Sequence, residues 1–230
     1  MSHTSSAEDS NAQEKGERLA QLLDRECSWF DEKECMDLIA NGADPNFIDQ
    51  YDRTVLILAV IRYNANIVNA LLESGADVNA KNHDQETALF CIGMAPEEMS
   101  DILIHHGADI ETRNGNGQTP LAHITEQRLT DSVKALIRHG AKINVRDNQE
   151  QTPLMYTARA WGEINICHLL LEHGAQTDLR DKDGKTAQDI AIFKEREDIF
   201  ARIEESKFRA ADAKGTPRKR RIHRKTSITP

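Results

Sequence analysis

A short Gly-Ala motif recurs five times along the 230 residues of this chain. It stands at Gly42-Ala43, Gly75-Ala76, Gly107-Ala108, Gly140-Ala141 and Gly174-Ala175, with spacings of 33, 32, 33 and 34 residues. A threonine ladder keeps the same four spacings, at Thr54, Thr87, Thr119, Thr152 and Thr186. A fixed period of this length indicates one supersecondary unit stacked several times, because such a unit cannot bury its apolar face alone. The chain is therefore expected to form a linear array.

The segment from 50 to 82 shows the unit most clearly. Thr54 is suited to cap a helix, and Leu56 and Ala59 follow it at helical spacing. A second apolar helical face is formed by Ile67, Val68, Leu71 and Leu72. It ends at Gly75, where a left-handed backbone costs glycine nothing. Each unit is thus predicted to be helix, turn, helix and projecting loop.

This period, with Thr-Pro-Leu at 119–121 and 152–154 and Gly-Ala-Asp at 42–44 and 75–77, resembles the ankyrin repeat. The resemblance implies an all-α ankyrin-repeat solenoid with four full repeats, at 50–82, 83–114, 115–147 and 148–181. Divergent caps are expected at 17–49 and 182–208, between a disordered polar leader (1–16) and a disordered basic tail (209–230). The last cap must meet water, and Glu195, Arg196, Glu197 and Asp198 are expected to coat it.

The chain departs from the family pattern in three ways. The His that usually follows Thr-Pro-Leu is replaced by Ile57, Phe90, Ala122 and Met155, which predicts a less stable array than an idealised one. The third unit is one residue short and contains Pro96, which limits its first helix. The fifth unit is one residue longer than the common period of 33, and the extra residue lies near Trp161. A bulge at either place is a binding feature or simple drift of the sequence.

The composition indicates an intracellular protein without catalytic activity. Its apolar runs are shorter than the roughly 20 residues of a membrane span, and its polar start lacks the apolar core of a secretory signal. The four cysteines form no Cys-x-x-Cys pair, which favours a reducing compartment. The titratable residues show no spacing typical of a catalytic or metal site, so we expect neither enzyme activity nor a cofactor.

Protein binding is the function that the resemblance implies. The family binds partners through loop tips and the exposed side of the first helices, which together form a concave face. Carried over residue by residue, this surface gives the candidates Tyr51, Arg53, His83, Met94, Gln118, His123, Tyr156, Arg159 and Trp161. The tyrosines, arginines and Trp161 are expected to contribute most, because Trp, Tyr and Arg dominate binding hot spots. An equal alternative for Trp161 is that it fills the space made by the extra residue.

Two further ladders each leave two interpretations open. Lys81, Arg113, Arg146 and Arg180 share one slot of the repeat. In one interpretation they form a basic stripe that binds an acidic partner. In the other they keep the loops solvated, and this interpretation is favoured because the surrounding chain is acidic. Asn46, Asn79 and Asn144 each follow a leucine by eight residues. This spacing resembles the asparaginyl hydroxylation context of ankyrin proteins in animal cells; the favoured alternative is that each Asn closes its loop.

Charge is divided unevenly along the chain. The net charge is −9, yet the residues from Lys214 onward hold seven Lys and Arg and no acid, which leaves −16 in the first 213. The densest basic residues are Arg218, Lys219, Arg220, Arg221, Arg224 and Lys225. They resemble a monopartite signal for a nuclear import receptor. The alternatives are contact with nucleic acid, attraction to an anionic membrane, and an intramolecular clasp on the acidic body.

Together these features predict a monomeric adaptor, scaffold or inhibitor that binds an unidentified protein partner in the cytoplasm or nucleus. The alternatives are a nucleic-acid-associated regulator that uses the basic tail, and a pathogen effector that binds a host protein.

Overall fold

The computed structural model describes residues 4–24, 30–93, 97–159 and 164–213. Apart from an isolated bridge between Ile48 and Thr54, the regular secondary structure of these residues consists of α helices and one short 3-10 helix, η1. The elements are α1 (Thr4–Leu23), α2 (Glu32–Ala40), α3 (Val55–Ile61), α4 (Ala65–Glu73), η1 (Ala88–Phe90), α5 (Glu97–His105), α6 (Pro120–Glu126), α7 (Thr130–Arg138), α8 (Pro153–Arg159), α9 (Ile164–Glu172), α10 (Ala187–Phe193) and α11 (Glu197–Ala213). The predicted all-α solenoid is confirmed.

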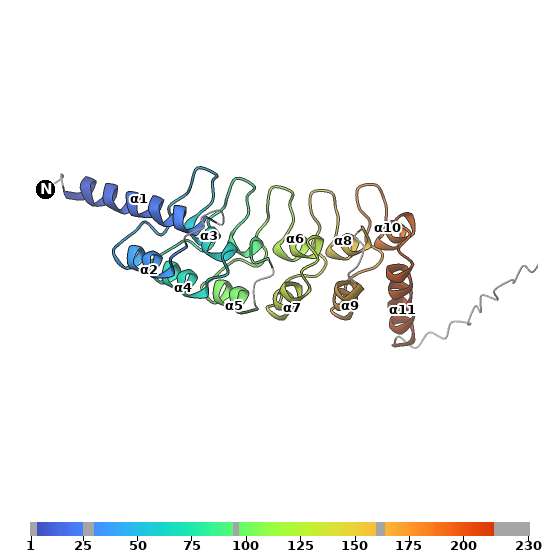
Figure 1. Cartoon of the computed structure of the whole chain (residues 1–230). Coiled ribbons are helices and arrows are strands. Elements are labelled where there is room, and N and C mark those ends of the chain that lie inside the picture. Colours follow the sequence, from blue (N-terminus) through green and yellow to red (C-terminus); the bar gives the residue numbers. More distant parts are fainter. Residues whose placement is uncertain (1–3, 25–29, 94–96, 160–163, 214–230) are drawn as a thin grey trace, which may run out of the picture.

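The helices form two layers along an elongated array (Figure 1). The first helices of successive units, α3, η1, α6, α8 and α10, contact one another in chain order, and so do the second helices α2, α4, α5, α7, α9 and α11. The core lies between the layers and consists mainly of Leu, Ile, Val and Ala. The loops between units project on one side of the first-helix layer (Figure 1).

The two sequence ladders mark the ends of the helices. Thr54 accepts a hydrogen bond from the Ile57 amide at 3.1 Å and so caps α3, as Thr119 does for α6. Gly75 follows α4 with a φ of +93°, a conformation that favours glycine. The Ala76 amide then donates to the Leu71 carbonyl at 3.0 Å. The period seen in the sequence is therefore the spacing of the helix ends.

The N-terminal boundary differs from the prediction of a disordered leader at 1–16. Helix α1 begins at Thr4, and its middle contacts the first cap. The Asp44 amide donates to the Ala12 carbonyl at 3.0 Å, and Lys15 Nζ donates to the Asn41 carbonyl at 2.7 Å. Gly16 is buried against Phe47, so closely that a Cβ at residue 16 would lie 2.7 Å from that of Phe47. At the other end α11 continues to Ala213, beyond the predicted limit at 208.

The third unit is irregular, as its short sequence and Pro96 predict. Its first helix is reduced to the three residues of η1, whereas the first helices of the units around it have seven. Thr87 makes no side-chain cap, unlike Thr54 and Thr119. The Ser132 hydroxyl donates to the Gly93 carbonyl at 2.7 Å and so ties the end of this segment to α7. Residues 94–96, and the insertion near Trp161, lie outside the described residues.

The asparagine ladder joins successive units. Asn79 Nδ2 donates to the Gly107 carbonyl at 3.0 Å, and its Oδ1 accepts from the Asp109 amide at 2.8 Å. Asn46 and Asn144 make the same pair of bonds to the units that follow them. Glu111 occupies the equivalent position between Asn79 and Asn144. Its Oε1 accepts from the Lys142 amide at 2.8 Å, but a carboxylate cannot donate to the Gly140 carbonyl. These side chains therefore act as struts between the units.

This defect predicts a stabilising substitution. Glu111→Asn should restore the missing donor and raise the free energy of unfolding by about 0.5–1 kcal/mol, the net value of one hydrogen bond near the surface. Urea unfolding followed by circular dichroism measures the change. Asn79→Glu, the reverse exchange in an intact slot, is the matched control and should destabilise by a similar amount. Loss of stability in both variants would show that the carboxylate of Glu111 serves the fold better than an amide.

Candidate functional site

Five projecting loops share one conformation. We number them loop 1 (49–53), loop 2 (82–86), loop 3 (114–118), loop 4 (147–151) and loop 5 (181–185). In each, the amide of the first residue donates to the carbonyl of the fifth, as Asp147 does to Gln151 at 3.0 Å. The side chain of the first residue accepts from amides of its own loop; Asp147 Oδ1 accepts from Gln149 and Gln151. The loops are therefore preformed hairpin-like turns.

Loops 2 to 5 are also joined in series. The Gly115, Asn148 and Lys182 amides donate to Asp84, Asn116 and Gln149 carbonyls of the preceding loops, at 2.8, 3.0 and 3.1 Å. The basic ladder reinforces these links. Lys81 Nζ donates to the Arg113 carbonyl at 3.2 Å, Arg113 donates to the Arg146 carbonyl at 2.8 Å, and Arg146 donates to the Arg180 carbonyl. These cations therefore hold neighbouring loops together.

The close approach of loops 3 and 4 gives a second prediction. Gly117 and Gly184 hold equivalent places with φ of +74° and +75°. A Cβ at Gly117 would lie 2.3 Å from Asn148 Oδ1 and 2.9 Å from the Asn148 nitrogen, whereas a Cβ at Gly184 would meet nothing within 4 Å. Because both alanines bear the same backbone strain, Gly117→Ala should lower the free energy of unfolding by ~1 kcal/mol more than Gly184→Ala. Equal losses in urea unfolding would show that Asn148 moves aside freely.

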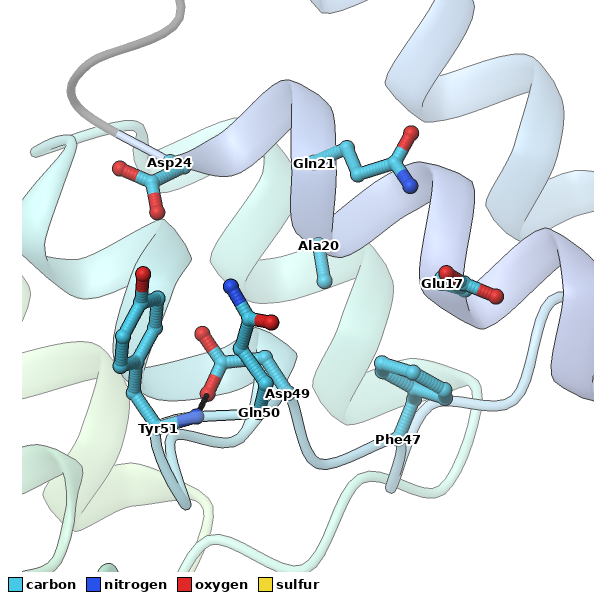
Figure 2. Close-up of a pocket in the computed structure, with 8 residues that line it drawn as sticks. All are labelled: Glu17, Ala20, Gln21, Asp24, Phe47, Asp49, Gln50 and Tyr51. Carbon is cyan, nitrogen blue, oxygen red and sulfur yellow. Dashed lines mark hydrogen bonds between the residues drawn. The ribbon is translucent and has the colours of Figure 1, made fainter.

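Loop 1 faces helix α1 across a hollow of about 180 Å³ (Figure 2). Arg53 bridges the two walls, because its guanidinium lies 2.6 Å from Asp24 at the end of α1 and 2.7 Å from Asp49 in the loop. It also lies over the Tyr51 ring, 4.9 Å from the centroid. The pairing leaves the Arg53 side chain half-buried and places it in the framework that fixes loop 1.

A polar network lies buried between loops 3 and 4. Gln118 Nε2 donates to the Tyr156 hydroxyl at 2.8 Å and to Glu126 Oε2 at 2.7 Å. The Tyr156 hydroxyl donates in turn to Asp147 Oδ2. His123 lies at the edge of this network, with Nδ1 3.4 Å from Gln118 Oε1. Gln118 and Tyr156 are 3% and 6% exposed. Neither therefore belongs to the contact surface that we propose, and both position the loops.

The remaining predicted residues divide between exposed and undescribed positions. Tyr51 is 63% exposed at the tip of loop 1, His83 is exposed on loop 2, and Arg159 is exposed at the end of α8. Met94, Trp161 and the six import-signal residues at 218–225 lie outside the described residues. The structure thus brings Tyr51, His83 and Arg159 to the loops and the first-helix layer.

The sequence analysis missed an exposed aromatic residue at the C-terminal end of this surface. Phe193 ends α10 and is 72% exposed. It follows Arg159 by 34 residues, the same interval that separates Thr152 from Thr186, so the two occupy one slot of the repeat. Arg159 and Phe193 line the same hollow, of about 310 Å³, beside loop 5. Extending the slot by one period would have found Phe193.

Comparison with known proteins agrees with this architecture. A family model described as ankyrin repeats (3 copies) matches residues 26–114, 94–183 and 121–206. The chain belongs to the ankyrin repeat family. Ankyrin repeats form protein–protein interaction modules.

The similar proteins share part of the array. Human transient receptor potential cation channel subfamily A member 1 is 31% identical over 159 residues, covering 66% of this chain and 14% of that protein. Potassium channel AKT1 of Oryza sativa subsp. indica is 37% identical over 82 residues, covering 34% and 8%. Mouse ankyrin repeat and SOCS box protein 6 is 33% identical over 90 residues, covering 37% and 22%. The chain spans less than a quarter of the length of each.

Three cysteine thiols of the described residues have raised pKa values. Burial raises the pKa of the Cys35 and Cys167 thiols to about 11 and that of Cys91 to about 12, so these thiols stay protonated and unreactive near neutral pH. Within the described ranges, no group of three or more His, Cys, Asp or Glu side chains converges as a metal site. In that same part of the chain, no helix combines the length and apolarity that crossing a bilayer requires.

Proposed function

We propose that this chain is a non-catalytic adaptor, scaffold or inhibitor that binds a partner protein through loops 1 to 5 and the exposed ends of α8 and α10. The observation that carries the proposal is the series of hydrogen bonds that joins loops 2 to 5. The linked loops present His83, and loop 1, which Arg53 ties to α1, presents Tyr51. Arg159 and Phe193 lie at the ends of α8 and α10 beside loop 5, so the four residues share a preorganised surface. Such a surface loses little entropy on binding, which favours affinity.

Site-specific photo-crosslinking tests this proposal. The photoreactive residue p-benzoylphenylalanine replaces Tyr51, His83 or Arg159 in the full chain, and the variants are irradiated in cell lysate. Adducts of one common mass are expected at these three positions. The matched controls are Met36 on α2 and Phe208 on α11, which are exposed but far from the loops. Adducts at the controls alone would place the binding surface elsewhere, and adducts removed by nuclease would favour a nucleic-acid-associated regulator.

The basic residues at 218–225 are proposed as a nuclear import signal. Their support is the density of positive charge and the lack of acids from Lys214 onward. A fluorescent fusion of the chain should move from nucleus to cytoplasm when Arg218, Lys219, Arg220 and Arg221 are all replaced by alanine. A fusion whose distribution is unchanged would contradict the proposal.

A further inference from the structure

The hollow beside loop 5 contains an exposed aromatic ring. Phe193 forms part of its lining together with Arg159, Lys185 and Lys194. Ile192, the neighbour of Phe193, is also 59% exposed. Burying a phenylalanine side chain gains about 1.5–3 kcal/mol relative to leaving it in water. The ring is therefore a ready anchor for an apolar side chain of a partner.

Cations surround this ring. The ammonium groups of Lys185 and Lys194 lie 5.3 and 5.5 Å from the ring centroid of Phe193. Arg159 and Lys194 form no ion pair with any described residue, and Lys185 approaches Asp183 only to 3.9 Å. The surrounding chain is acidic, because residues 1–213 have a net charge of −16. Such a local excess of positive charge favours a negatively charged ligand.

Two acidic residues, Asp181 and Asp183, line the hollow together with the three cations. The Asp183 side chain is exposed and lies 3.9 Å from Lys185. Asp181 is buried, and its Oδ1 accepts from the Asp183 and Lys185 amides at 3.0 and 2.9 Å. Asp189, close by on α10, accepts from the Thr186 amide and hydroxyl in a capping box, at 2.9 and 2.8 Å. Asp189 also lies 3.9 Å from Arg180. Asp181 and Asp183 offset two of the three positive charges that line the hollow, so one cation remains in excess.

We propose that this hollow binds an acidic segment of the partner protein that carries an apolar or aromatic side chain. The apolar side chain packs on Phe193, and carboxylates flanking it pair with Arg159, Lys185 and Lys194. This inference rests on the proposed function and adds the chemistry of the partner. The chain's own basic tail is disfavoured as the occupant, because its seven Lys and Arg would face like charges.

Three labelled peptides test the inference by fluorescence anisotropy with the full chain. They are acetyl-GEEFLEEG, the basic acetyl-GKKFLKKG, and acetyl-GEEGSEEG, which keeps the acids and lacks the anchor. We expect the first to bind at least about tenfold more tightly than either of the others. The third peptide corrects for attraction of acids to the basic tail, which acts equally on both acidic peptides. Equal binding of all three would overturn the inference.

Paired substitutions locate the binding. Phe193→Ser and Lys194→Glu should each weaken binding of the first peptide at least about fivefold. Their controls, Phe208→Ser and Lys142→Glu, make the same changes at exposed positions away from the hollow and should stay within about twofold of the unchanged chain. Controls as damaging as the test variants would contradict the inference.

Two outcomes separate the inference from the proposed function. Crosslinks at Tyr51 and His83, which lie outside the hollow, do not depend on the peptide chemistry. If those crosslinks form while the peptides fail to discriminate, only the inference is wrong. If light scattering shows a concentration-dependent dimer that Phe193→Ser abolishes, the occupant is a second copy of the chain, which also overturns the inference.

Discussion

Replacing Arg196 by alanine is expected to lower the free energy of unfolding by about 3 kcal/mol. The Arg196 side chain is 1% exposed, the largest fully buried side chain among the described residues. Its Nε and one terminal nitrogen bind the two carboxylate oxygens of Asp198, both at 2.8 Å, and the other terminal nitrogen lies 3.5 Å from the Thr157 carbonyl. The side chain thus ties the start of α11 to α8.

The size of this loss combines two effects. Truncation leaves a cavity at the end of the array, and it removes the partner of Asp198. Because Asp198 keeps 44% of its side chain exposed, water replaces part of the lost interaction. The cost should therefore fall at the lower end of the range of about 3–5 kcal/mol known for broken buried pairs.

Urea unfolding of the full chain, followed by circular dichroism, measures the loss. Arg202→Ala on α11 is the matched control, because Arg202 pairs with Glu205 at 3.1 Å near the surface. That control should cost less than about 1 kcal/mol. Similar losses in the two variants would show that the burial of Arg196 contributes little to the stability of the last cap.

Acid titration provides an independent check of the same pair. The hydrogen bonds from Arg196 hold the pKa of Asp198 below its ordinary value, and burial opposes them. When folding lowers the pKa of a carboxyl group, the resulting stabilisation is fully present above the unfolded-state pKa of about 3.9. This stabilisation is lost as the pH falls through the folded-state pKa. The stability difference between the chain and Arg196→Ala should therefore narrow below about pH 4. A difference that stays constant would assign the whole loss to the cavity.

Much of the fold could be predicted because its signals are local. Thr54 caps α3 by accepting from an amide only three residues later, and Gly75 ends the next helix within its own unit. The sequence did not indicate that α1 packs on the first cap, because the residue that Gly16 contacts is Phe47, in another part of that cap. Arg196 was expected in solvent because charged residues usually lie there. Its burial depends on α8, whose Thr157 carbonyl lies 39 residues earlier.

The candidate site was predicted less well because exposure depends on neighbouring units. Tyr156 and Gln118 lie 38 residues apart and bury each other, which the pattern within one repeat does not show. Arg53 was expected to bind a partner, yet its ion pair with Asp24 comes from α1, a helix that the sequence analysis placed partly in a disordered leader. Tyr51 and His83 remain exposed because loop tips have few neighbours to cover them.

Replacing Tyr156 by phenylalanine should lower the free energy of unfolding by about 2–3 kcal/mol. The ring fits as before, but the hydroxyl that donates to Asp147 and accepts from Gln118 is lost. Burial raises the pKa of Tyr156, so the hydroxyl stays protonated and keeps its donor role across the physiological range. Asp147 Oδ2 is thereby left without this donor in a residue that is 9% exposed, which is costly for a carboxylate.

The matched control is Tyr51→Phe, because Tyr51 is 63% exposed. That variant should unfold within about 0.5 kcal/mol of the unchanged chain. The pair also separates the two roles assigned to tyrosine in this protein. Tyr156→Phe should lower the free energy of unfolding. While it is folded, it should still form the adduct when p-benzoylphenylalanine replaces Arg159, because the contact surface is unchanged. A folded Tyr156→Phe chain of normal stability that fails to form the adduct would make Tyr156 a direct contact after all.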